Sequence, residues 1–103
     1  MAELFDKDYM KASAKFKEAS KEQVEAFKKY KETLTKGPFD KKTSELLMLA
    51  AGIAIQCDYC IDSHSKKAKA AGATSEELAF VVHLAAEVKH GATVSYGLKA
   101  LQE

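Results

Sequence analysis

The chain has 103 residues, which is enough for one domain with a modest core and too few for two domains. Its hydrophobic fraction of 47% and charged fraction of 30% are those of an ordinary globular protein. The formal net charge is +1, so the chain has no strong electrostatic field that would favour nucleic acid or a membrane surface. All 16 basic residues are lysines, so the guanidinium groups that usually recognise bases and phosphates are absent from the sequence.

Helix-forming residues dominate the chain, and no period-two alternation is long enough to predict a strand. Gly37–Pro38 is expected to end the first helix, and a capping box of Thr74 and Glu77 is expected to open the fourth. Gly91 is expected to break the chain before a last short helix. The expected helices are residues 7–36, about 40–56, 58–72, 74–90 and 93–101. The sequence therefore predicts an all-α fold, a small multi-helix domain of about five helices that fills the single domain 1–103.

Two of these helices carry segments that are apolar on nearly every side, ELLMLAAGIAIQ and LAFVVHLAAEVKH. A domain of this size offers few neighbours that could cover both segments. We therefore expect part of this surface to be buried between subunits of a homo-oligomer. The alternative is a monomer in which the remaining helices wrap around both segments.

The segment CDYCIDSH, residues 57–64, contains both cysteines of the chain and a histidine. At the start of a helix, Cys57 and Cys60 lie within reach of each other, and His64 shares a face with Cys60. The exposed N–H groups of a helix start and a nearby imidazole both favour a thiolate, and can lower a cysteine pKa from about 8.5 toward 7. A thiolate with a second thiol beside it can attack an oxidant, and the partner then resolves the product. The spacing indicates a redox dithiol.

The expected compartment agrees with this interpretation. The opening residues, MAELFDKDYMK, hold no apolar stretch of signal-peptide length, and the longest apolar run, Leu46 to Ile55, is about half of a bilayer span. We therefore expect a cytoplasmic protein that does not engage a membrane. Permanent disulfides are rare in a reducing compartment, where a close cysteine pair is more often catalytic or metal-binding.

Two other interpretations of the cysteines stay open on the residues alone. A zinc site needs four ligands, of which Cys57, Cys60 and His64 supply three, and His83 or His90 would have to be the fourth. The cysteines could also be two unrelated buried residues. For the other histidines we expect His83 to be a core or interface residue and His90 an exposed cation near a helix end.

The stretch from Glu45 to Thr74, ELLMLAAGIAIQCDYCIDSHSKKAKAAGAT, resembles the carboxymuconolactone decarboxylase family in its alkylhydroperoxidase AhpD-like branch. That branch has a glutamate twelve residues before a CxxC motif and a histidine four residues after its second cysteine. Glu45, Cys57, Cys60 and His64 stand at these places. The resemblance, strongest over residues 40–100, implies an all-helical fold.

The resemblance also implies a function, that of a peroxidase working through a cysteine pair. Cys60 would be the peroxidatic thiolate, Cys57 the resolving thiol, and His64 with Glu45 a proton relay. It further implies a hydroperoxide substrate, an external dithiol reductant of the lipoyl type, and assembly as trimers or hexamers. We expect neither a cofactor nor a bound metal. One position departs from the pattern: Tyr59 stands where the best-characterised members have a second histidine, and a phenol of pKa about 10 does not shuttle protons near neutrality.

Other roles remain open for the same residues. The pair could serve a redox-sensing or binding module that switches between dithiol and disulfide, or the chain could be a decarboxylase-like member without peroxidase activity. Glu45 could be a carboxylate that only favours its helix start, and His64 an ordinary surface histidine. If the two helices paired as a strict antiparallel hairpin about residue 57, His64 would lie more than one turn short of Glu45. Contact would then require crossed helices or an intervening water.

Overall fold

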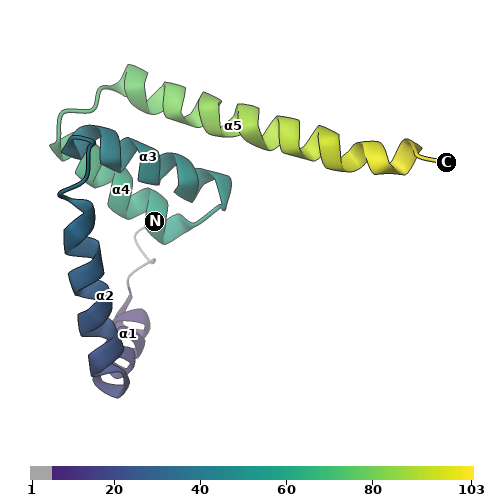
Figure 1. Cartoon of the computed structure of the whole chain (residues 1–103). Coiled ribbons are helices and arrows are strands. Elements are labelled where there is room, and N and C mark those ends of the chain that lie inside the picture. The colour runs from purple at the N-terminus through teal and green to yellow at the C-terminus, as the bar shows by residue number, and fades with distance from the viewer. Residues whose placement is uncertain (1–5) are drawn as a thin grey trace. The chain divides into compact units, whose positions relative to one another are not determined.

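The structure is a computed structural model that describes residues 6–103. The first five residues lie outside the described residues, and they are part of the opening segment in which we expect no signal peptide. Every regular element among the described residues is helical, so the predicted all-α class is confirmed. The elements, shown in Figure 1, are α1 (Lys7–Ala19), α2 (Lys21–Leu34), α3 (Lys41–Ala54), α4 (Asp58–Ala70), α5 (Ser75–Gly97) and the 3-10 turn η1 (Leu98–Leu101).

The chain divides into two compact units, residues 1–40 and 41–103. The first unit contains α1 and α2, and the second contains α3, α4, α5 and η1. The cysteines, His64 and Glu45 all belong to the second unit. The assignment of residues 1–103 to one domain stays a prediction.

In the first unit, the predicted single helix over residues 7–36 is wrong, because the chain leaves the helical conformation at Ser20. The backbone there has φ −139° and ψ 47°. Both the N–H and the hydroxyl of Ser20 donate to the carbonyl oxygen of Phe16, at 3.1 and 2.6 Å. A serine that satisfies the backbone in this way competes with helix continuation. Two helices result, and neither contains a buried residue.

In the second unit, α3 and α4 form an antiparallel helical hairpin, and α5 packs across α3 (Figure 1). α4 ends in a turn at Gly72, whose φ of +97° lies in the left-handed region that glycine adopts without cost. The N–H of Gly72 donates to the carbonyl of Lys69, and that of Ala73 to the carbonyl of Ala68, the two bonds of a Schellman motif. The predicted helix end near Gly72 is therefore confirmed.

The predicted break at Gly91 and the separate helix over residues 93–101 are wrong. α5 continues through Gly91 to Gly97, and only a 3-10 turn follows. Glycine inside a helix costs about 1 kcal/mol relative to alanine, which is too little to end a long helix without a competing turn. The predicted capping box at the start of α5 is confirmed: the Glu77 N–H donates to Oγ1 of Thr74 at 3.1 Å, and the Thr74 N–H donates to Oε1 of Glu77 at 2.9 Å.

The core of the second unit is small and lies between the three helices. Its buried apolar side chains are Leu49, Ala68, Val81 and Ala85. Much apolar surface of α5 is left uncovered. Figure 1 shows that α5 extends past α3 and α4. His83 is exposed, with its ring 6.2 Å from that of Phe80, so the expectation of a core position for His83 is wrong within this chain. Over residues 6–103, no helix has both the length and the apolar character needed to cross a membrane.

Glu77 also ties α5 to α3, through an ion pair between its Oε2 and Nζ of Lys42 at 3.0 Å. The backbone N–H of Thr74, and then Lys42, hold the pKa of Glu77 below its usual 4.5. Because the folded-state pKa is the lower one, the stabilisation is complete above the unfolded pKa and is lost as the pH falls through the folded value.

We predict that Glu77→Gln, which keeps an oxygen for the cap and loses the charge, unfolds at lower urea concentration than the unchanged protein at pH 7. The difference should shrink as the pH falls below about 4.5, because the unchanged Glu77 then becomes neutral as well. Urea denaturation at a series of pH values measures this difference. Glu76→Gln, in the same helical turn but outside the capping box, is the control. A pH-independent difference between Glu77→Gln and the unchanged protein would contradict the prediction.

Candidate functional site

The turn between α3 and α4 places the first cysteine at the start of a helix. The N–H of Gln56 donates to the carbonyl of Ile53 at 3.0 Å, and the N–H of Cys57 donates to the carbonyl of Gly52 at 2.9 Å. These bonds form a second Schellman motif, with Gln56 at the left-handed position, φ 56°. Glycine is the usual residue there, so Gln56 holds a conformation that is uncommon for side chains with a Cβ. Cys57 follows directly and is the N-cap residue of α4.

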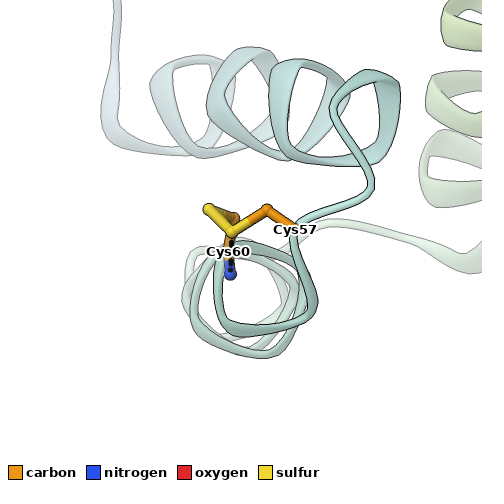
Figure 2. Close-up of a disulfide and its surroundings, with 2 residues drawn as sticks. All are labelled: Cys57 and Cys60. Carbon is orange, nitrogen blue, oxygen red and sulfur yellow. Dashed lines mark hydrogen bonds between the residues drawn. A yellow bond between two sulfur atoms is a disulfide. The ribbon is translucent and has the colours of Figure 1, made fainter.

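Cys57 and Cys60 are joined by a disulfide, with their Cα atoms 5.2 Å apart. The N–H of Cys60 donates to Sγ of Cys57 at 3.2 Å (Figure 2), so a sulfur takes the place that a serine or aspartate oxygen usually occupies at an N-cap. Figure 2 shows the bridge on the side of α4 that faces α3. Both cysteines are half-buried. The sulfurs therefore lie where the partial positive charge of a helix start favours a thiolate once the bridge is reduced.

One turn further along α4, His64 contacts Glu45 of α3 directly. Nδ1 of His64 lies 2.7 Å from Oε2 of Glu45. Glu45 is the one charged residue buried among the described residues, with 6% of its surface exposed, and the His64 side chain is 22% exposed. Neither a surface position for His64 nor a carboxylate that serves only its helix start fits this geometry.

The direct contact has a simple axial explanation. The side chain of Cys60 packs against Gly52, so these two residues stand at the same level of the hairpin. From that level, Glu45 lies seven residues along α3 and His64 four residues along α4. The difference of three residues corresponds to about 4.5 Å along the axis, which the long Glu45 side chain and the His64 ring span. No intervening water is required.

The pair determines which histidine nitrogen is available for chemistry. An ionised carboxylate can only accept hydrogen bonds, so opposite an ionised Glu45 the N–H at Nδ1 of His64 is the donor of this hydrogen bond. Nε2 is then the nitrogen that can exchange a proton with another group. A carboxylate behind an imidazole fixes the ring orientation and stabilises the imidazolium when it forms.

Two pairs of the predicted site residues are thus brought together: Cys57 with Cys60, and Glu45 with His64. α4 links the pairs, because His64 follows Cys60 by four residues and so stands one turn away on the same face. No cluster of three or more metal-ligating side chains occurs within the described part of the chain, and the sulfurs are bonded to each other. The zinc interpretation therefore finds no ligand set in residues 6–103.

This arrangement of helices and side chains agrees with the comparison with known families. The family model of the carboxymuconolactone decarboxylase family matches residues 12–103. The chain belongs to this family. The family includes decarboxylases and alkylhydroperoxidases.

Two individual proteins are also similar to the chain. One is uncharacterized protein 4 in the cox locus of Paracoccus denitrificans, with 38% identity over 65 residues, or 63% of this chain. The chain covers about three fifths (59%) of the length of that relative. The other is a protein from Methanobacterium thermoautotrophicum, known from a crystal structure solved in structural genomics. It shares 28% identity and has a TM-score of 0.73, over 79% of this chain and 94% of the other. Neither name states an activity.

The Glu45–His64 contact leads to a prediction for stability. Removing one partner leaves a buried polar group unsatisfied, so Glu45→Ala and His64→Ala should each lower the free energy of unfolding by about 1–3 kcal/mol. The double variant should lose less than the sum of the two, with a coupling of about 1–3 kcal/mol. Urea denaturation of the four proteins measures this coupling.

Glu45→Gln is the matched control for the same experiment. Its amide oxygen can still accept from Nδ1 of His64, so Glu45→Gln should keep more of the stability than Glu45→Ala. A coupling near zero, with Gln and Ala equally destabilising, would mean that the contact contributes nothing to the fold.

Proposed function

We propose that the chain is a thiol-dependent peroxidase of the alkylhydroperoxidase AhpD-like branch, which reduces hydroperoxides through Cys57 and Cys60. The observation that carries the proposal is the Glu45–His64 hydrogen bond one helical turn from a cysteine pair at a helix start. A cysteine pair alone serves many purposes. A buried carboxylate that orients a histidine beside the pair adds the means to move a proton, which peroxide reduction requires.

In the proposed reaction, His64 takes the thiol proton of Cys60 through Nε2, and Glu45 stabilises the imidazolium through Nδ1. The Cys60 thiolate attacks the outer oxygen of the hydroperoxide, so an S–O bond forms and the O–O bond breaks. The leaving alkoxide takes a proton from the imidazolium and departs as an alcohol. The sulfur is now a sulfenic acid, and the peroxide has been reduced.

The second half of the cycle uses Cys57. Its thiolate attacks Sγ of the sulfenic acid, which forms the disulfide and releases hydroxide that is protonated to water. An external dithiol, of the lipoyl type by family resemblance, then reduces the disulfide by thiol–disulfide exchange and becomes a disulfide itself. No cofactor or metal enters this cycle. We place it in the cytoplasm, where a reducing thiol pool maintains such donors.

The variants of the two cysteines test this division of roles. Cys60→Ser should abolish peroxide consumption, because the attacking sulfur is gone. Cys57→Ser should consume about one equivalent of peroxide and stop at the sulfenic acid. Peroxide assays, with mass spectrometry after dimedone trapping, measure both outcomes. Continued turnover by Cys60→Ser would overturn the assignment.

A second outcome would favour a different function. If the unchanged protein forms and loses its disulfide readily but consumes peroxide slowly or not at all, the pair serves as a redox switch. The feature that makes this candidate specific is Tyr59, which stands between the cysteines where the best-characterised members have a second histidine. A phenol is a poor proton shuttle near neutral pH.

We also propose that the chain functions as a homo-oligomer, of the trimeric or hexameric type that the resemblance implies. The support is the apolar surface of α5, where large side chains remain exposed in the single chain: Phe80, Val82, Leu84, Val88, Val94 and Tyr96. Apolar surface of this extent on one helix is typical of a subunit interface. A second copy of the chain offers a matching surface.

Light scattering tests the assembly directly. The unchanged protein should have a mass several times 11.3 kDa. Leu84→Glu, which puts a charge on the exposed apolar surface of α5, should shift the mass toward the monomer. Lys89→Glu, on the same helix and also exposed, is the matched control and should keep the oligomeric mass. A monomeric unchanged protein would contradict the proposal.

A further inference from the structure

Gly52 lies where α3 comes close to the first turn of α4. It is buried in α3, and a Cβ added to it would stand 2.8 Å from Cβ of Cys60. Non-bonded carbons attract best at about 3.5–4.0 Å, so a side chain of any kind at this position requires one helix to move. The first turn of α4 can therefore lie this close to α3 only because residue 52 has no side chain.

The same residue also holds the other cysteine. The carbonyl of Gly52 accepts the N–H of Cys57 at 2.9 Å, as part of the Schellman motif at the end of α3. Gly52 thus contacts the backbone of Cys57 on one side and the side chain of Cys60 on the other. No other described glycine meets a cysteine: a Cβ on Gly91, for example, would meet nothing within 4 Å.

We propose that Gly52 is a positioning residue that sets the placement of Cys60 relative to Cys57, and thereby the balance between dithiol and disulfide. A Cβ at residue 52 would push Cys60 away from α3, while Cys57 stays bonded to the α3 carbonyl. A disulfide tolerates only a narrow range of Cα separations and Cβ directions, whereas two free thiols impose no such requirement. Added bulk at residue 52 therefore disfavours the disulfide more than the dithiol. The consequence for peroxide turnover rests on the proposed function, but the effect on the equilibrium does not.

The test compares Gly52→Ala with Gly91→Ala, which makes the same substitution inside a helix without a neighbour. Each protein is equilibrated in buffers of reduced and oxidised dithiothreitol, and the oxidised fraction is read by alkylation and mass spectrometry. Gly52→Ala should lower the equilibrium constant for disulfide formation by about tenfold, since strain makes a disulfide easier to reduce. Gly91→Ala should leave the constant unchanged. An unchanged constant in Gly52→Ala would overturn the proposal.

A second measurement covers the case in which Gly52→Ala folds poorly. In a Cys60→Gly background the atom that a new Cβ would meet is gone. The loss of thermal stability caused by Gly52→Ala should therefore be clear when residue 60 is cysteine. It should largely vanish when residue 60 is glycine. An equal loss in both backgrounds, or failure of both to fold, would overturn the proposal.

The proposed function can fail independently of this inference. If the unchanged protein does not consume peroxide but Gly52→Ala still shifts the thiol equilibrium, the peroxidase proposal is lost and the positioning role stands. If the unchanged protein consumes peroxide but Gly52→Ala does not shift the thiol equilibrium, the positioning role is lost and the peroxidase proposal stands.

Discussion

Three residues, 55–57, connect α3 to α4, and each donates a backbone hydrogen bond to an α3 carbonyl, which holds that turn in one conformation. Because the turn is short and fixed, the register of one helix on the other is fixed as well. Cys60 then falls opposite Gly52, and His64 comes within hydrogen-bonding distance of Glu45. The cysteine pair and the glutamate–histidine pair are thus two consequences of one helix–turn–helix geometry.

The sequence predicted the helices of the second unit well where side chains act locally. The capping box of Thr74 and Glu77 and the helix end at Gly72 depend on residues three or four apart, and both were predicted from residue type alone. The errors at Ser20 and Gly91 have the opposite origin. Serine and glycine each permit both outcomes, and the choice depends on small backbone energies. The core position expected for His83 is wrong because an apolar sequence around a residue does not tell which side of the helix is covered within the chain; its interface position stays a prediction.

For the candidate site, the sequence predicted which residues form pairs but not the distances between them. Cys57 caps the helix that contains Cys60 and His64, so the common face of the three residues follows from helical periodicity. The approach of Glu45 crosses between helices, and an idealised hairpin placed it too far away. Gly52 and Gln56 were missed altogether. Gly52, a glycine inside an apolar helix, was a signal for close backbone approach. Nothing in the sequence indicated that Gln56 adopts a left-handed backbone conformation.

The buried carboxylate of Glu45 links the packing of α3 on α4 to the orientation of the His64 ring. A carboxylate with 6% exposure is costly unless it is hydrogen-bonded, and His64 supplies that bond. The fold therefore favours the hydrogen bond between Nδ1 of His64 and Glu45 whether the two cysteines are oxidised or reduced. Any proton that the imidazole exchanges with the rest of the site must then pass through Nε2. The contact that satisfies the buried carboxylate thereby also leaves Nε2 as the nitrogen available to the proposed proton relay, one helical turn from Cys60.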